Sequence, residues 1–362
     1  MASLIQIELE NFRNWVETLF IPSNDGITAI VGDNGQGKTN LLESIFYLCV
    51  GSSFRTSAKD VLVNFGSDQA ILHGIINVKD RNIELDASIS KTQKDRHLVN
   101  KKPPAKISDL RNEIPIVSFS PDDLQLVKGP PGNRRTLIDD FLIQTSKSSA
   151  VLIDEIDKIL RHRSALYKSA TFSDQQEIEW SLDVWDEKLA VSGTELIRRR
   201  VAALARLEPL AQELYCKLSQ KRDSLEISYA SSFSGPLKDA LLASRKDDLR
   251  RQVTSVGPHR DDIEVILGKM PARACASQGE QRTISYVIKA AMCRLLEEVA
   301  RETPIVLLDD ILSELDANRS KSLLELIPDG QILLSATALP DGVDTVAKVV
   351  SVNGGTLLLR LS

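Results

Sequence analysis

The sequence has few cysteines, and those present lie far apart. Its 362 residues contain four of them, Cys49, Cys216, Cys275 and Cys293, and no two form a CxxC pair. A disulfide framework or a zinc site would need cysteines at closer and more regular spacing. We therefore expect neither, and this cysteine usage fits the reducing cytoplasm best.

Long apolar runs are missing as well. No stretch of about 18 uncharged apolar residues occurs, which argues against a membrane-spanning helix. The chain begins Met-Ala-Ser and continues directly into a strand-like alternation, without the apolar core of a signal peptide. It has no repeats of fixed period and no low-complexity tracts. We expect a globular cytoplasmic protein without a membrane partner.

An excess of positive charge is also absent. The net charge is −5, which alone argues mildly against binding to nucleic acid. Binding needs only one basic surface, however, and several local clusters of basic residues could form one. These are Lys101-Lys102, Arg134-Arg135, Arg161 with Arg163, Arg198-Arg199-Arg200, and Arg250-Arg251. For each cluster, a solvated helix face is the simpler interpretation.

The character of the chain changes twice along its length. Both outer parts combine strand-like and helical patterns, as in the alternation from Ile5 to Glu10. The Pro- and Gly-rich segment 128–132 is followed by a largely helical middle part. We predict an α/β fold in which one domain is split in sequence into residues 1–125 and 250–362. A mainly helical second domain, residues 126–249, would be inserted between its halves.

A glycine-rich segment matches the phosphate-binding pattern GxxxxGK[ST]. A β-prone run precedes it and a helical stretch follows, which is the context that this motif requires. Its glycines let successive N–H groups point at phosphate oxygens, the lysine meets the β- and γ-phosphates, and the threonine hydroxyl can bind Mg²⁺. The segment comprises Gly32, Asp33, Asn34, Gly35, Gln36, Gly37, Lys38 and Thr39, and Asn40 follows it. We predict an ATP site here.

Four apolar residues that end in two acids form a second motif, Ile305 to Asp310. This pattern predicts a buried parallel strand that carries a carboxylate to the edge of the sheet where α/β proteins bind ligands. We predict that Asp309 contacts Mg²⁺ through a water molecule, because Mg²⁺ gives up its hydration shell reluctantly. Asp310 would orient or deprotonate the attacking water.

A third motif precedes a long helical run. It consists of Ser277, Gln278, Gly279 and Glu280. A Ser and a Gly at a helix start suit contact with phosphate, although a plain helix cap is the alternative. The order of the motifs favours contact with phosphate, because it is the order found in ABC-type ATPases. In that order, the phosphate-binding loop (P-loop, residues 32–39) comes first, then this segment, then the apolar strand ending in two acids, and last Ser313-Glu314-Leu315-Asp316.

The resemblance narrows to one family when further blocks are added. They are Asn11-Phe12-Arg13-Asn14-Trp15; Ser118 to Leu124 with Val127-Lys128-Gly129-Pro130 and Arg134-Arg135; Gly257-Pro258-His259-Arg260-Asp261-Asp262; and Ala276 to Thr283. Together with the motifs above they resemble the RecF family in order, from residue 5 to about residue 320. The sequence departs from the family pattern at Leu137, where a Phe is usual.

The resemblance implies an SMC-head-like ABC-type ATPase with a compact helical second domain. It implies weak, DNA-stimulated hydrolysis of ATP, and a homodimer that closes when ATP binds. Each phosphate site would then be completed by the partner's Ser277–Glu280 segment, which is called the signature segment below. The implied partners are double-stranded DNA, junctions between duplex and single strand, and the RecO and RecR mediators that load RecA at gaps in recombinational repair and the SOS response. Arg13 is implied as a phosphate- or base-side contact.

Some roles stay open. No histidine of the transporter type follows the strand 331–334, so Ser335 or Thr337 would sense the γ-phosphate. Gln125 is a candidate for the Q-loop glutamine. His259 could be a catalytic base, or could have a structural or DNA-side role.

Two other classes of protein share parts of this pattern. A transporter nucleotide subunit would have an LSGGQ motif and the switch histidine. A non-hydrolysing adaptor is the second alternative, because Asp310 stands where many such ATPases have Glu.

Overall fold

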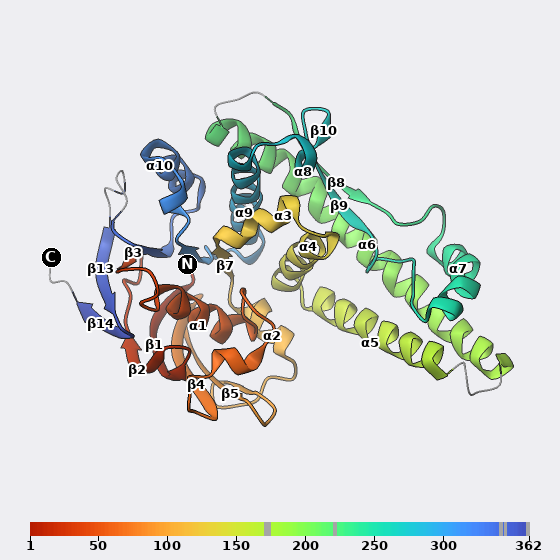
Figure 1. Ribbon diagram of the computed structural model, residues 1–362, viewed down its shortest axis with the longest axis horizontal. Helices are drawn as coiled ribbons and strands as arrows, with labels where there is room; N and C mark the ends of the chain where they lie inside the picture. Colours follow the sequence, from red (N-terminus) through yellow and green to blue (C-terminus); the bar gives the residue numbers. More distant parts are fainter. Residues whose placement is uncertain (170–174, 220–222, 340–342, 344–345, 360–362) are drawn as a thin grey trace. The chain divides into compact units, whose positions relative to one another are not determined.

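The computed structural model describes residues 1–169, 175–219, 223–339, 343 and 346–359 (Figure 1). The chain forms two compact units, of which the first comprises Met1–Leu124, Leu214–Lys221 and Arg282–Ser362. The second comprises Gln125–Glu213 and Arg222–Gln281. This division differs from the sequence-based boundary at residue 250, because residues 262–267 pair with a strand of the second unit and so belong to it.

A six-stranded sheet carries the P-loop. Its order is β14-β13-β3-β12-β11-β7, and all neighbours are parallel except β13 and β14. The strands are β3 (Gly26–Val31), β7 (Ile116–Phe119), β11 (Ile305–Asp309), β12 (Gln331–Ala336), β13 (Val346–Asn353) and β14 (Thr356–Leu359). The central strands β3, β11 and β12 are mostly apolar and are buried along nearly their whole length, as expected for parallel strands covered on both faces. The register places Asp309 beside Ser335.

A second, antiparallel sheet of the first unit has the order β2-β1-β4-β5-β6. Its strands are β1 (Ser3–Phe12), β2 (Trp15–Phe20), β4 (Gln69–Val78), β5 (Arg81–Ser90) and β6 (Arg96–Val99). Buried and less buried residues alternate along β4 and β5, so one face of the sheet joins the core and the other faces outward.

Helix α1 (Lys38–Val50) contacts strands of both sheets and joins them into one hydrophobic core. It begins with the last two residues of the P-loop, and Gly51, whose φ is 76°, caps its end in the left-handed conformation. The remaining helices of this unit are short, apart from α9, which begins in the second unit. They are η1 (Lys59–Leu62), α2 (Ile107–Glu113), η2 (Pro121–Leu124), α9 (Gln278–Ala300), η3 (Leu312–Glu314) and α10 (Ala317–Leu326).

The second unit is mainly helical, as Figure 1 shows for the segment coloured yellow to green. Its helices are α3 (Gln125–Lys128), α4 (Pro131–Thr145), α5 (Lys147–Ser169), α6 (Gln175–Ser219, whose last turns belong to the first unit), α7 (Leu237–Arg251) and α8 (Ala272–Cys275). A small antiparallel sheet joins β8 (Leu225–Ala230), β9 (Asp262–Leu267) and β10 (Met270–Pro271).

Ion pairs hold the helices of the second unit together. Arg163 of α5 is fully buried and pairs with Asp186 of α6, while its guanidinium lies 4.0 Å from Asp248 of α7. Arg245 also donates to Asp186. No helix in the described ranges has the length and apolar character to span a membrane.

Candidate nucleotide site

The P-loop connects β3 to α1 and depends on glycine at two positions. At Gly32, a Cβ atom would collide with the carbonyl oxygen of Val352. At Gly37, φ is 112° and a Cβ atom would collide with the side chain of Asn14. Any other residue would push the loop away from these neighbours, so the sequence pattern reflects close backbone packing as well as room for phosphate.

The Lys38 ammonium is held in the centre of the loop. It donates hydrogen bonds to the carbonyl oxygens of Gly32, at 2.7 Å, and Asp33, at 2.8 Å. Burial lowers the pKa of this ammonium, and the nearby carboxylates Asp310 and Asp309 offset the effect only in part. A buried cation held by neutral carbonyls is ready to meet an anionic ligand.

The P-loop and β12 each contribute a hydroxyl that donates to the carboxylate at the end of β11. Asp309 Oδ1 accepts hydrogen bonds from Thr39 Oγ1, at 2.6 Å, and Ser335 Oγ, at 2.8 Å. Burial raises the pKa of Asp309 although both hydrogen bonds oppose the shift. A hydroxyl beside a carboxylate is an oxygen donor set that suits hydrated Mg²⁺, so the residues present fit this cation.

Asp310 is held in an unusual backbone conformation next to Asp309. Its φ is 52°, and its N–H donates to Ser335 through the carbonyl oxygen, at 3.2 Å, and Oγ, at 3.1 Å. Among the described residues, Asp310 Oδ1 is buried without a hydrogen-bond partner. A buried carboxylate oxygen without a protein partner needs a hydrogen bond from water or from a ligand. This is the arrangement expected of a residue that orients a water molecule.

The turn between β1 and β2 supports the P-loop from the side. Asn14 Nδ2 donates to the Gln36 carbonyl at 2.9 Å, Asn40 donates to Asn14 Oδ1 at 2.7 Å, and Trp15 Nε1 donates to the Gly37 carbonyl at 3.1 Å. Sequence reasoning used this block only for family resemblance and missed its supporting contacts.

Arg13, in the same turn, makes a bidentate pair with Glu43 of α1. The two N–O distances are both 2.9 Å, and Glu43 is completely buried. Arg55 lies 3.6 Å from the same carboxylate and donates to Asn40 Oδ1 at 3.0 Å. Its charge also lowers the pKa of Asp309 against the effect of burial, so Arg55 is a cation of this site that the motifs did not reveal.

The turn between β13 and β14 closes the loop from another side. Gly354 N–H donates to Gln36 Oε1 at 2.5 Å, and Gly355 N–H donates to the Gln36 carbonyl at 3.2 Å. Of the two residues considered as γ-phosphate sensors, Ser335 is buried against Asp309, whereas Thr337 is exposed just beyond β12.

The segment Ser277–Glu280 lies at the N-terminus of α9, in the second unit. Ser277 Oγ accepts from the Glu280 N–H at 3.3 Å, and Glu280 Oε2 accepts from the Ser277 N–H at 2.8 Å and hydroxyl at 2.9 Å. This is a capping box. Ser277, Gln278 and Gly279 are nevertheless exposed, so the helix start is accessible to another molecule.

The acidic turn after β11 is anchored to α9 within the first unit. Glu314 accepts from Arg282 at 2.9 Å and from the Tyr286 hydroxyl at 3.5 Å. Asp316 caps α10 by accepting from the Arg319 N–H at 2.9 Å. These contacts fix the Ser313–Asp316 turn relative to the long helix that follows the signature segment.

His259 and Gln125 both belong to the second unit, and Gln125 is exposed at the start of α3. His259 Nε2 bonds to the Thr254 carbonyl at 3.0 Å, and burial lowers its pKa to about 4. The ring also lines a cavity of about 210 Å³ together with Arg135 and Arg200. A neutral, partly buried imidazole bonded to the backbone fits a structural role.

The structure separates the basic clusters of the sequence into buried and exposed residues. Arg134, Arg163 and Arg200 are buried, and pair with Asp262, Asp186 and Asp139 respectively. These arginines hold the second unit together. The exposed members of the clusters include Lys102, Arg161, Arg198, Arg250 and Arg251.

Comparison with known proteins agrees with this geometry. Residues 3–338 match the family model described as "RecF/RecN/SMC N terminal domain". Two proteins named "DNA replication and repair protein RecF" are similar over most of their length. The one from Streptomyces avermitilis is 33% identical, covering 94% of each chain, and the one from Symbiobacterium thermophilum is 35% identical, covering 93% of this chain and 92% of the relative.

Solved structures show the same fold. The structure described as "recombination mediator protein RecF-ATP in RecFOR pathway" has a TM-score of 0.92 and 28% identity, covering 99% of this chain and 98% of the other. An Smc head domain from Pyrococcus furiosus has a TM-score of 0.59 and 16% identity, covering 99% and 96%.

The parallel sheet, the P-loop and the acidic end of β11 define an ABC-type ATP-binding protein with the fold of an SMC head and a helical insertion. Within that class, the similarity of this chain to proteins named RecF over nearly its whole length identifies the family. The chain belongs to the RecF family.

Proposed function

We propose that this protein binds ATP and Mg²⁺, hydrolyses ATP slowly, and closes into a homodimer on double-stranded DNA when ATP is bound. The observation that carries the proposal is the link from Thr39 through Asp309 to Ser335, with the unpartnered carboxylate oxygen of Asp310 beside it. This combination offers a metal-binding pair and a water-orienting acid next to a phosphate loop.

Each residue of the site would have a separate role. Lys38 would attract the β- and γ-phosphates, and the loop N–H groups of residues 32–37 would bind phosphate oxygens. Thr39 and Asp309 would hold Mg²⁺, which when bound neutralises charge on the phosphates. Asp310 would orient the attacking water, and Arg55 would add positive charge where negative charge develops.

The dimer is proposed from the exposed start of α9. Ser277 and Gly279 are exposed at the positive end of a 23-residue helix. In an ABC-type arrangement this segment would reach the γ-phosphate bound to a second copy. Each copy would then need the other to complete its site, so ATP would favour the closed state through differential binding.

The biological role follows from the family. We propose that the ATP-bound dimer recognises duplex DNA and its junctions with single strands in the bacterial cytoplasm, and helps RecR- and RecO-like mediators to load RecA at gaps. The RecF relatives named for DNA replication and repair, and the solved RecF described as a recombination mediator, support this role.

The Ser277→Arg variant tests the dimer. A large cation in place of the serine would block the partner's phosphate site, while the P-loop of the variant would remain intact. We expect wild-type ATP affinity by fluorescent-nucleotide titration, together with loss of the ATP-dependent dimer by light scattering. Ser234→Arg, at an exposed serine of the same unit, is the matched control. Undiminished dimerisation of Ser277→Arg would rule out the proposed role of this segment.

A further inference from the structure

A histidine and several carboxylates gather on the outward face of the antiparallel sheet. His73 of β4 lies between two buried neighbours, Leu72 and Gly74, and so points away from the core. In register it stands opposite Asp86 of β5 and, on its other side, opposite Glu8 of β1. Glu84 lies two residues before Asp86 and therefore on the same face.

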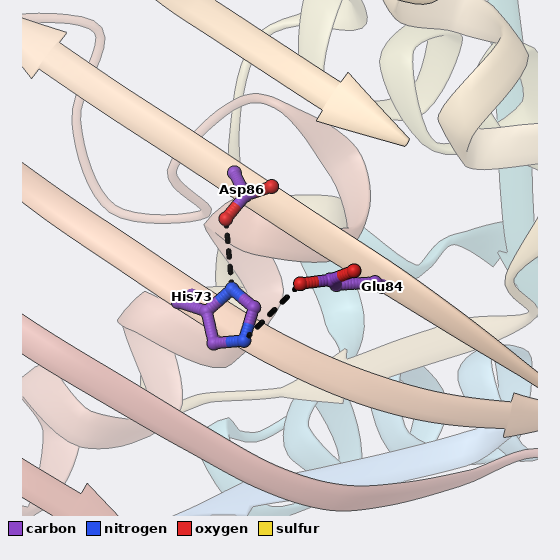
Figure 2. A group of neighbouring side chains, drawn as sticks. All are labelled: His73, Glu84 and Asp86. Carbon is purple, nitrogen blue, oxygen red and sulfur yellow. Dashed lines mark hydrogen bonds and ion pairs between the residues drawn. The ribbon is translucent and has the colours of Figure 1, made fainter. Parts of the chain in front are cut away.

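The two ring nitrogens of His73 have different neighbours (Figure 2). Nδ1 lies 2.7 Å from Asp86 Oδ1, and Nε2 lies 3.7 Å from Glu84 Oε1. A carboxylate can only accept a hydrogen bond, so Nδ1 carries the proton in the first contact. In the neutral ring, Nε2 then presents a lone pair toward the Glu84 oxygen. Two acceptors facing each other repel, and either a cation between them or a second proton on the ring removes that repulsion.

The separation of these two atoms suits a metal ion. Zinc binds imidazole nitrogen and carboxylate oxygen at about 2.0–2.2 Å, so a tetrahedral centre holds the two donor atoms about 3.4 Å apart. The observed 3.7 Å differs from this by a few tenths of an ångström. We propose that His73 Nε2 and Glu84 bind a divalent transition-metal ion such as Zn²⁺, with Asp86 orienting the histidine.

Asp86 has the features of such an orienting group. A histidine that binds a metal generally donates its other N–H to a carboxylate, which fixes the tautomer and strengthens the ligand. Among the described residues, Asp86 Oδ2 is buried and has no hydrogen-bond donor. The three side chains each offer a ligand atom, and these atoms lie within 4.8 Å of one another. Water would complete the coordination of an ion held by His73 and Glu84.

Lys101 is the cation that competes for this site. Its ammonium contacts Glu84 directly and lies 4.0 Å from Asp86 Oδ2. The lysine side chain is 64% exposed, so it can move into solvent without breaking the core. The carboxylates Glu8, Glu84 and Asp86 outnumber this single ammonium, which leaves the sheet face attractive to a further positive charge.

The mixed ligand set selects the class of metal. Imidazole favours zinc, nickel and copper, whereas Mg²⁺ prefers oxygen ligands alone. The site contains no residue of the P-loop or of β11, so it is independent of the proposed ATP hydrolysis. Its occupancy can be measured on the nucleotide-free chain.

The test is a calorimetric titration of the full, nucleotide-free chain with Zn²⁺, comparing wild type with His73→Gln. We expect His73→Gln to lose one equivalent of bound zinc, or to bind it at least tenfold more weakly. His162→Gln, at an exposed histidine of α5, should bind as wild type does. Lys101→Ala should bind more tightly, because the competing ammonium is gone. Mg²⁺ in place of Zn²⁺ should give no heat that depends on His73.

A spectroscopic arm identifies the ligand atom. In a ¹⁵N-labelled sample, Zn²⁺ should shift the Nε2 resonance of His73 and leave Nδ1 protonated. Glu84→Gln, which retains size and removes the charge, should abolish that shift if the fold is intact by circular dichroism. Equal zinc titrations for wild type and His73→Gln would overturn the proposal, as would weaker binding by Lys101→Ala.

Discussion

Arg13 either supports the fold through its ion pair with Glu43 or contacts the nucleotide, and removing its charge distinguishes the two roles. The perturbation is Arg13→Met, which keeps the length of the side chain and removes its charge. Glu43 is completely buried, and the substitution removes both of its 2.9 Å hydrogen bonds from Arg13. The carboxylate would keep a bond from the Ser53 hydroxyl at 2.5 Å and the guanidinium of Arg55 at 3.6 Å.

The size of the effect follows from these contacts. Removing one partner of a fully buried ion pair costs about 3–5 kcal/mol. Because Arg13 is 18% exposed and Arg55 remains nearby, we expect a cost somewhat below that range, about 2–3 kcal/mol. For a domain of roughly 200 residues this corresponds to a fall in Tm of about 5–10 °C. The double variant Arg13→Met/Glu43→Met should recover most of the loss, because no buried charge is then left unpaired.

The assay is thermal unfolding of the full chain by calorimetry, following the transition that ATP stabilises. Arg81→Met, at an exposed arginine of the same unit, is the control and should change stability by no more than about 0.5 kcal/mol. An unchanged Tm for Arg13→Met, combined with a large loss of ATP affinity, would refute the supporting role. It would assign Arg13 to the nucleotide instead.

Three further predictions concern other parts of the molecule. Asp310→Asn should retain ATP binding and lower the single-turnover hydrolysis rate by about 10²-fold or more; a wild-type rate would mean that another group orients the water. His259 has a folded-state pKa of about 4, below its unfolded value of about 6.5, so the unfolded chain gains a proton first as pH falls. Its contribution to stability, up to about 3 kcal/mol, should therefore be lost as pH falls from 6.5 to 4, and His259→Gln should flatten that dependence while His162→Gln should not. Arg163→Ala should destabilise the second unit by about 3 kcal/mol in urea unfolding, since Asp186 keeps Arg245 but the buried cluster loses its central cation; a loss below 0.5 kcal/mol would contradict the assigned role.

The sequence predicted the elements that carry the site because their patterns are local. The apolar run before Asp309 became β11, and the glycine-rich loop became the connection from β3 to α1. Strand order and register are not local properties. The contact of Asp309 with Ser335, 26 residues later, depends on the neighbouring positions of β11 and β12 in the sheet.

The contacts that support the P-loop were also beyond the sequence patterns. Asn14, Gly354 and Gly355 meet the backbone or side chain of Gln36 from opposite ends of the chain. The basic clusters could not be interpreted from the sequence for a related reason. A run of basic residues does not show which arginines are exposed to solvent and which are buried. Arg163 and Arg200 proved to be interior ion-pair partners.

The proposed dimer is tested most directly by the molar mass of the wild-type chain in solution, measured by light scattering with and without Mg²⁺-ATP and with a short DNA duplex. We expect a monomer without nucleotide, a dimer with Mg²⁺-ATP, and duplex DNA that elutes with the dimer. A chain that binds ATP and stays monomeric in the presence of DNA would contradict the proposal that two copies complete each other's nucleotide site.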